Sequence, residues 1–204
     1  MLDVTSLYLK PGLDLAKPLD NANYSAIIHA LTRQPGFKTL WEARSEWNHE
    51  FVVWLIDRNR LTDHEDFMAN KEEYAQMVNP LLEMGATERD DFIQVRHLPP
   101  SSSFLNMSLS DPVTERIVTI LWLRTSERSS LGRFVEVVQD AQDKLRGRRC
   151  LVAVGVPVEQ AGECILFIHA AESGQLVGPE DINGLFGDAV DIIARGAFNL
   201  TSHS

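Results

Sequence analysis

The six histidines of this sequence are its side chains best suited to acid and base chemistry, because imidazole titrates near neutral pH. None of them forms a recognisable dyad or a metal-ligating spacing along the chain, so we expect no metal site. His64 begins a helical pattern and could point into a cavity at the start of that helix, or could serve only as a capping residue. His97 ends a predicted strand, where a structural role is the simpler interpretation.

Aromatic and charged side chains alternate along two predicted strands, residues 37–47 and 50–57. If a tight turn joins the strands, residues whose numbers sum to about 97 face one another. One face of this hairpin then carries Trp41, Ala43, Trp54 and Ile56. The opposite face carries Glu42, Arg44, Glu46, Val53 and Leu55. The tryptophan face suits a planar apolar ligand, although the tryptophans could equally be core residues and the charges could discourage pairing between sheet edges.

Composition and charge exclude several classes of function. The chain of 204 residues has 19 basic and 29 acidic residues and a net charge of -10, and it carries no basic stripe for nucleic acid or an anionic membrane. It has neither an apolar run of about 20 residues nor an export signal, so we expect a cytoplasmic protein. Nucleotide-binding and serine-hydrolase motifs are absent, so no cofactor is expected, although a single histidine suffices to ligate haem.

The two cysteines, Cys150 and Cys164, fall in apolar runs that read as the two arms of one hairpin. Counting back from the turn pairs Cys150 with a residue near Ala170, which leaves the two sulfur atoms too far apart for a disulfide. We therefore expect two free, buried thiols, in agreement with a reducing compartment.

Apolar periodicity and turn residues predict the order strand, helix, strand, strand, helix, strand, twice along the chain. In the first half the expected strands are residues 4–10, 37–47, 50–57 and 92–98, with helices capped by Asp20 or Asn21 and by Asn70. In the second half they are residues 116–124, 150–158, 163–171 and 197–201, with helices over 134–145 and 179–196. A linker, residues 99–111, separates the predicted domains 1–98 and 112–204.

This order predicts an α+β fold made of two tandem ferredoxin-like βαββαβ units, with strands 37–47 and 92–98 at the edges of the first sheet. Several strands are continuously apolar, which favours burial on both faces. Helices can cover one face, and packing of one sheet against the other can cover the second. We therefore expect a barrel-like core within one chain, in a monomer with an internal pseudo-dimer or in a homodimer.

The stretch Phe37-Lys-Thr-Leu-Trp41-Glu42-Ala-Arg44, followed by Val52-Val-Trp54-Leu-Ile-Asp57 and Asp63-His64-Glu65-Asp66-Phe67-Met68-Ala-Asn-Lys-Glu-Glu-Tyr74, resembles a known family. It is similar to fungal members of the dimeric α/β-barrel superfamily, in particular to antibiotic-biosynthesis-monooxygenase-like domains. The resemblance covers residues 4–97, whereas the second half matches only in the order of its elements.

The resemblance implies ferredoxin-like units that pair sheet to sheet, and activities that include cofactor-independent oxygenation of aromatic polyketide-like molecules, cyclisation, decarboxylation and haem degradation. We expect an enzyme of secondary metabolism that binds a small apolar or aromatic metabolite. His64 would carry a proton and Arg44 would pair with an oxyanion, with Glu42 at the same site. The residues expected to contact the substrate are Trp41, Trp54, Phe67 and Tyr74. The alternative is a non-catalytic small-molecule-binding or assembly protein with the same fold.

Overall fold

The computed structural model describes residues 1–14, 17–99, 117–148, 150–170, 179–199 and 201–203. The chain divides into two compact units, an N-terminal unit of Met1–His97 with Thr201–Ser204, and a C-terminal unit of Leu98–Leu200. Apart from Pro99, the predicted linker at residues 99–111 lies outside the described residues.

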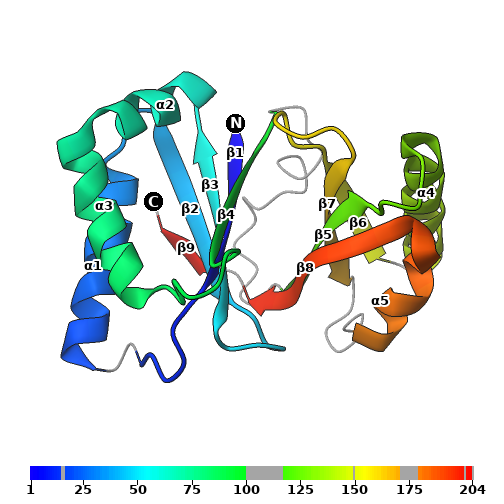
Figure 1. Ribbon diagram of the computed structural model, residues 1–204, viewed down its shortest axis with the longest axis horizontal. Helices are drawn as coiled ribbons and strands as arrows, with labels where there is room; N and C mark the ends of the chain where they lie inside the picture. The colour runs from blue at the N-terminus through cyan, green and yellow to red at the C-terminus, as the bar shows by residue number, and fades with distance from the viewer. Residues whose placement is uncertain (15–16, 100–116, 149, 171–178, 200, 204) are drawn as a thin grey trace. The chain divides into compact units, whose positions relative to one another are not determined.

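The N-terminal unit has the βαββαβ order, with one extra short helix. Its elements are β1 (Leu2–Tyr8), α1 (Pro18–Thr32), β2 (Phe37–Arg44), β3 (Phe51–Arg58), α2 (Leu61–Ala69), α3 (Lys71–Met84) and β4 (Ile93–Leu98). The strands lie in the order β4-β1-β3-β2-β9, where β9 is Thr201–His203. The three helices cover one face of this sheet (Figure 1).

The start of α1 differs from the prediction. Lys17 occupies the N-cap position without a side-chain hydrogen bond, Pro18 lies in the first turn, and neither Asp20 nor Asn21 is the cap. Proline suits this position because its ring fixes φ near the helical value. The backbone N–H that proline lacks would have no hydrogen-bond partner in the first turn of a helix. The predicted cap of α3 is confirmed, because the side chain of Asn70 accepts a hydrogen bond from the backbone N–H of Glu73 at 3.4 Å.

The register of the β2–β3 hairpin differs by one residue from the predicted register. Leu40 pairs with Ile56, Glu42 with Trp54, and Arg44 with Val52. The connection runs from Arg44 to Phe51 and is longer than a tight turn. Within it, the Ser45 hydroxyl accepts hydrogen bonds from the backbone N–H groups of Trp47 and Asn48, at 3.2 and 3.3 Å. A shift of one residue moves a side chain to the other face of a sheet. The prediction that Trp41 and Trp54 share a face is therefore wrong.

The face of the sheet that carries Trp54 is the one that packs against the helices. A buried cluster joins strand residues with helix residues, and its members are Leu7, Leu9, Ile27, Leu31, Leu40, Val52, Trp54, Ile56, Phe67, Met77, Leu81 and Met84. Burial of these side chains provides the main stabilisation of the N-terminal unit, at about 1.5–3 kcal/mol for each large side chain.

The prediction that residues 37–47 form an edge strand is also wrong. Strand β2 pairs with β3 on one side and with β9 on the other, where Leu40, Trp41 and Glu42 lie opposite His203, Ser202 and Thr201. Strand β4 is an edge, as predicted. Strand β9, from the C-terminal end of the chain, thus pairs with backbone N–H and C=O groups of β2 that would be exposed if β2 were an edge strand.

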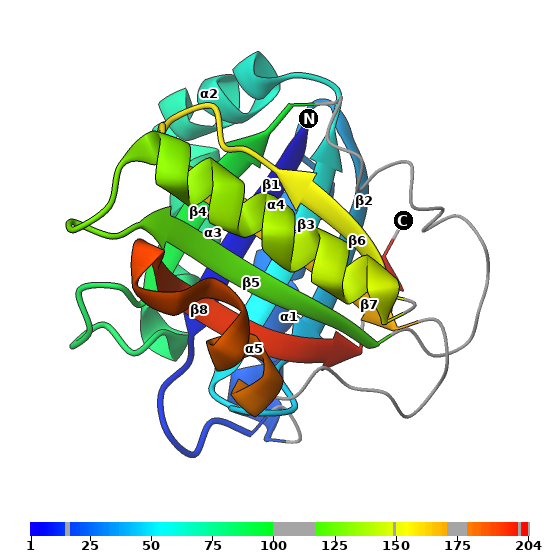
Figure 2. The same ribbon diagram turned by 90° about the vertical axis from the view of Figure 1, so that its right-hand side faces the viewer.

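The C-terminal unit repeats the same topology. Its elements are β5 (Ile117–Thr125), α4 (Leu131–Gly147), β6 (Cys150–Gly155), β7 (Glu163–Ala170), α5 (Pro179–Phe186), the short 3-10 helix η1 (Gly187–Ala189) and β8 (Val190–Asn199). The strand order β6-β7-β5-β8 corresponds to β2-β3-β1-β4 of the N-terminal unit. Helices α4 and α5 lie on one face of the sheet (Figure 2). The chain therefore has an α+β fold of two tandem ferredoxin-like units, whereas the packing of one sheet against the other stays a prediction.

The predicted helix over residues 179–196 is wrong in its second half. Helix α5 ends at Phe186, the following Gly187 has a positive φ of 58°, and Val190–Asn199 form strand β8. This strand pairs with β5 from Ile117 to Thr125. Apolar residues at helical spacing can also fit a strand, and here the long pairing with β5 outweighs the local pattern.

The expectations for the cysteines are confirmed. Cys150 pairs with Ala170 across the β6–β7 hairpin, and both cysteines are free and buried. Among the described residues, no helix is long and apolar enough to cross a membrane.

Candidate functional site

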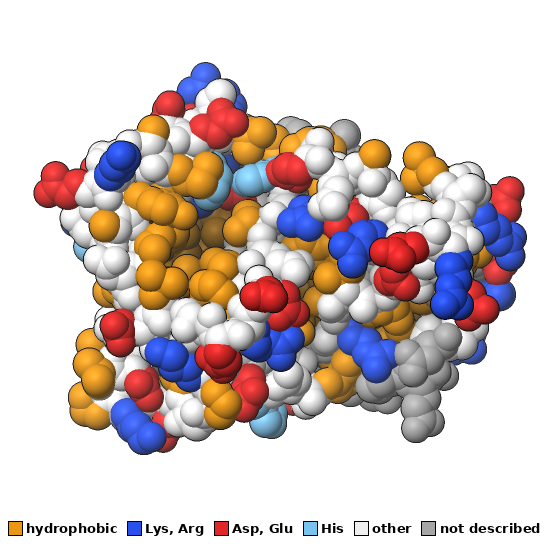
Figure 3. Space-filling model, in the orientation of Figure 1, with side chains coloured by type: hydrophobic (Ala, Val, Ile, Leu, Met, Phe, Trp, Pro, Cys, Tyr) orange, Lys and Arg blue, Asp and Glu red, His pale blue; other side chains and the backbone are white. Residues whose placement is uncertain are grey.

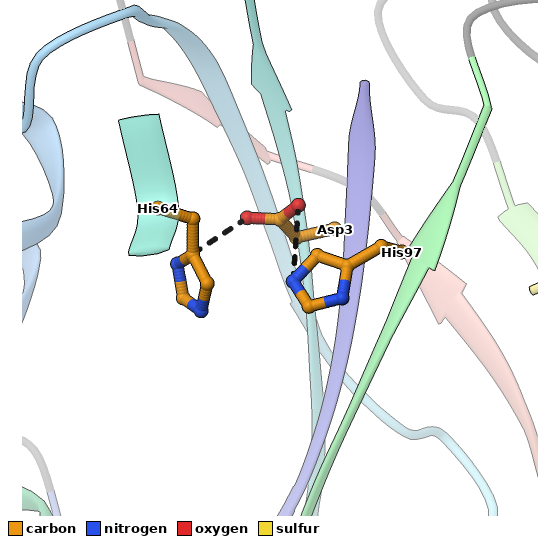
Figure 4. Close-up of side chains that lie close together, drawn as sticks. All are labelled: Asp3, His64 and His97. Atoms are coloured by element: carbon orange, nitrogen blue, oxygen red, sulfur yellow. Dashed lines mark ion pairs between the residues drawn. The ribbon is translucent and has the colours of Figure 1, made fainter. Parts of the chain in front are cut away.

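Three titratable side chains from different elements meet in the N-terminal unit. Asp3 comes from β1, His64 from the first turns of α2, and His97 from β4, and their side chains converge in Figure 4. Asp3 Oδ2 lies 3.9 Å from His64 Nδ1, and Asp3 Oδ1 lies 3.8 Å from His97 Nε2. The two imidazole rings have centroids 5.1 Å apart. We call this group the His-Asp cluster.

The sheet register places Asp3 on the helix-covered face. Asp3 lies opposite Ile56, a member of the buried cluster, and only 1% of its surface is exposed. Burial of a lone carboxylate is costly, and the compensation comes from Arg58, whose Nε donates to Asp3 Oδ2 and whose side chain is also fully buried. This ion pair holds the carboxylate between the two histidines.

A close contact between the start of α2 and the α1–β2 connection positions His64. The Asp63 carboxylate accepts a hydrogen bond from the backbone N–H of Arg60 at 3.2 Å, which satisfies a donor at the start of the helix. Gly36, with a φ of 74°, lies so close that a Cβ atom on it would overlap the Asp63 carboxylate. The glycine is therefore required both by its backbone conformation and by its close contact with α2.

Burial keeps the His64 imidazole neutral. It lowers the pKa of His64 from 6.5 to about 4, an effect that Arg58 and His97 reinforce and that the Asp3 carboxylate only partly opposes. At neutral pH the His64 ring is thus uncharged, and its contact with Asp3 becomes an ion pair only in acid. A neutral ring offers one nitrogen lone pair for a proton or a metal ion.

Several polar atoms of the site are buried without a hydrogen-bond partner among the described residues. They are Asp3 Oδ1, His64 Nδ1, and Nη1 and Nη2 of Arg58. The contacts between Asp3 and the histidines, at 3.8 and 3.9 Å, are longer than hydrogen bonds. Each unsatisfied buried group costs about 1–3 kcal/mol of folding free energy. A ligand that offers polar contacts to these atoms would recover part of that cost.

Aromatic side chains adjoin the cluster. Trp54 is the diagonal neighbour of Asp3 on the same face of the sheet, because Asp3 pairs with Ile56 and Thr5 pairs with Trp54. Phe67 follows His64 by three residues on α2 and contacts Tyr74 edge to face, with ring centroids 5.7 Å apart. Figure 3 shows a hollow lined by hydrophobic side chains in the area bordered by α2, α3 and β4, with histidine side chains at its rim.

The structure brings together some of the predicted site residues and separates others. Trp54, Phe67 and Tyr74 lie in or against the core on the helix-covered face, where His64 also contacts Asp3. Trp41 lies on the other face, opposite Leu55.

Glu42 and Arg44 share the helix-covered face but lie away from the His-Asp cluster. Ile56 of β3 pairs with Asp3 of β1 on one side and with Leu40 of β2 on the other. Leu40 is therefore the β2 residue at the same level of the sheet as Asp3. Arg44 is four residues further along β2, a distance of about 13 Å along the strand, and Glu42 is two residues further, about 7 Å. The predicted grouping of Arg44 and Glu42 with His64 has no support in this register.

Sequence reasoning missed three residues of the site: Asp3, Arg58 and His97. Asp3 is the second residue of β1 and Arg58 is the last residue of β3, and both lie just outside the strands predicted at residues 4–10 and 50–57. The meeting of His97 with His64 had no signal in the sequence, because it depends on β4 lying next to β1.

Comparison with known proteins shows a shared fold and little shared sequence. No family model matches the chain, and no curated protein matches it. A solved structure of an anthrone oxidase-like protein superposes with a TM-score of 0.59 at 11% identity, covering 100% of this chain and 92% of the other. A candidate chlorite dismutase gives 0.56 at 10% identity, covering 98% and 95%. A candidate monooxygenase from Fusobacterium nucleatum gives 0.52 at 9% identity, covering 100% and 92%. At these identities the likeness establishes the fold alone.

Proposed function

We propose that the N-terminal unit is an enzyme that binds an apolar aromatic or polyketide-like molecule and moves a proton at the His-Asp cluster without an organic cofactor. The observation that carries this proposal is the position of His64, which lies beside the charged Asp3–Arg58 pair and three residues before Phe67 on α2. Phe67 and Trp54 both belong to the buried apolar cluster on this face of the sheet. Apolar walls with a few convergent polar groups are typical of small-molecule sites.

Oxygenation is the reaction that we favour. A base that removes a proton from an acidic ring carbon creates a carbanion, which can reduce O2 directly. For anthrone the balanced reaction is one anthrone and one O2 to one anthraquinone and one water. His64 would accept the ring proton, while Asp3 would stabilise the imidazolium that forms and Arg58 would hold Asp3 in place. The name of the anthrone oxidase-like neighbour supports anthrone as the first substrate to test.

The test compares turnover of anthrone under air by the chelator-treated chain and its His64→Ala variant. We expect a loss of about 100-fold or more in kcat, after subtraction of the spontaneous oxidation, because general-base catalysis contributes about 100–10,000-fold. His49→Ala is the matched control, since His49 is exposed in the β2–β3 connection. Equal turnover by both variants would overturn the role of His64.

A carrier protein with the same fold is the competing function. It would bind an apolar aromatic molecule at the same hollow and release it unchanged. Native mass spectrometry of the purified chain, followed by denaturation and identification of the released compound, distinguishes the two functions. An intact ligand that the protein never converts under air favours the carrier.

A further inference from the structure

We infer that Asp3, His64 and His97 form a binding site for one divalent first-row transition-metal ion. Two imidazoles and one carboxylate are a ligand set that suits Zn²⁺, Fe²⁺ and their neighbours, and it leaves coordination positions open for water or another ligand. Among the His, Cys, Asp and Glu side chains that the structure describes, these three bring their ligand atoms close enough together to hold one ion.

The spacing of the ligand atoms fits an ion better than it fits hydrogen bonds. All three ligand atoms lie within 4.8 Å of one another, and Asp3 Oδ1 lies 3.8 Å from His97 Nε2. An ion placed equally far from three atoms at such separations lies about 2.2–2.8 Å from each, against metal–ligand distances of about 2.0–2.2 Å. Small rotations of the side chains close that difference.

The partners of the three residues also suit a metal site. Arg58 Nε donates to Asp3 Oδ2, which leaves Oδ1 as a buried oxygen that has no hydrogen-bond partner among the described residues. An outer hydrogen bond of this kind orients a ligating carboxylate. His64 Nδ1 is likewise buried without such a partner in the described part of the chain. One ion would satisfy both atoms and would also engage His97.

Access and charge set the conditions for binding. The side chains of His64 and His97 are each 13% exposed, so an ion can reach them from the side on which the histidines lie. The Arg58 guanidinium opposes a cation, whereas the Asp3 carboxylate attracts it, so the site offers no surplus of negative charge. Specificity must then come from the imidazole ligands, which favour Zn²⁺ and Co²⁺ over Mg²⁺ and Ca²⁺.

An ion at this site would compete with a proton for the lone pair of His64. If the proposed function holds, the Zn²⁺-loaded chain should therefore lose its anthrone turnover and recover it with a chelator. Only this expected loss of turnover rests on the proposed function. Metal binding is measured without any substrate, so a chain that binds Zn²⁺ but does not oxidise anthrone would contradict the proposed function and not the metal site.

The experiment is titration of the chelator-treated full chain with Zn²⁺ by isothermal calorimetry, with metal content counted after dialysis and Co²⁺ absorption reporting the ligand set. We expect one Zn²⁺ per chain, bound at least about 100-fold more weakly by His97→Ala and His64→Ala, because even outer-shell partners contribute about 10–100-fold. The exposed histidines His29 and His49 provide the controls His29→Ala and His49→Ala.

Two results would overturn the inference: no Zn²⁺ bound by the wild-type chain, or the same affinity in the His97→Ala and His49→Ala variants. Asp3→Asn is less informative because it leaves the Arg58 charge buried, so circular dichroism must first show that each variant is folded. His97→Ala keeps the test decisive, because an alanine at this position leaves both members of the Asp3–Arg58 pair in place.

Discussion

The first strands of the two units, β1 and β5, occupy the same place in sheets of the same topology but bury different side chains. Strand β1 buries Asp3, Thr5 and Ser6 among its apolar residues, whereas β5 buries an almost continuous apolar run from Val118 to Leu123. The fold therefore requires only that this strand is buried. A site for proton chemistry additionally requires a polar side chain in it, which β1 has at Asp3.

The buried carboxylates of the two units also have different partners. Asp3 pairs with the Arg58 guanidinium and lies between two histidines, whereas Glu163 in β7 accepts a hydrogen bond from Trp122 Nε1 at 3.2 Å. A charged partner and two titratable neighbours suit proton or metal chemistry. A neutral indole donor suits a structural role.

Removal of the Asp3 carboxylate from its ion pair with Arg58 should destabilise the protein most. Asp3→Leu leaves the Arg58 charge uncompensated and should lower the free energy of unfolding by about 3–5 kcal/mol in urea denaturation. Glu163→Gln retains an acceptor for Trp122 and should cost about 1–2 kcal/mol. Asp91→Leu is the surface control for Asp3→Leu, since the Asp91 side chain is 43% exposed. If Asp3→Leu and Glu163→Gln lowered the free energy of unfolding equally, the proposed difference between the buried carboxylates of the two units would be contradicted.

Acid should destabilise the protein through His64. Its pKa is about 4 in the folded chain and about 6.5 when unfolded, so the unfolded chain binds more protons between these values. Stability is therefore retained above about pH 6.5 and falls as the pH drops towards 4, by no more than about 3 kcal/mol.

The groups that face His64 are Asp3, Arg58 and His97, and all three stay in place in His64→Gln. Urea denaturation of the chelator-treated chain at pH 7 and pH 4 should give a smaller difference for this variant than for the wild type. If His64→Gln loses as much stability in acid as the wild type, the acid effect belongs to other carboxylates. His49→Gln serves as the matched exposed control.

Two glycines with positive φ should respond differently to alanine. At Gly36 a Cβ atom overlaps the Asp63 carboxylate, so Gly36→Ala should cost about 2 kcal/mol in strain and lost capping of α2. At Gly187 in the C-terminal unit a Cβ atom meets no described atom within 4 Å, so Gly187→Ala should cost about 1 kcal/mol from backbone strain alone. Thermal unfolding measures both, and a larger loss at Gly187 would contradict this ranking.

The smallest effect concerns the thiols of the C-terminal unit. Burial, with a further contribution from Glu163, raises the pKa of Cys164 to about 12, so the thiolate is scarce at pH 8. We expect alkylation of Cys164 by iodoacetamide, followed by mass spectrometry, to be at least about 10-fold slower than that of an unfolded control in urea. Rapid labelling of the folded chain would show that the core of this unit opens readily.

The candidate site could be predicted only in part. His64, Trp54, Phe67 and Tyr74 were predicted from the family resemblance, and three of the four lie close together in the sequence, on α2 and at the start of α3. The prediction that Trp41 and Trp54 share a face was wrong because a register shift of one residue in the hairpin moves a side chain to the opposite face of the sheet. Asp3 and His97 lie 94 positions apart in the sequence, and only the strand order β4-β1 brings them together.

Periodicity, turn residues and spacing are local properties, and they suffice to predict the order of the elements, the two ferredoxin-like units and the free state of the two cysteines. Other features appear only in the folded chain: the hairpin register, the end of α5 at Phe186, the addition of β9 to the first sheet and the meeting of Asp3 with two histidines. These features depend on pairings between distant strands. The energy of such a pairing comes from both partners together, so neither segment can reveal it alone.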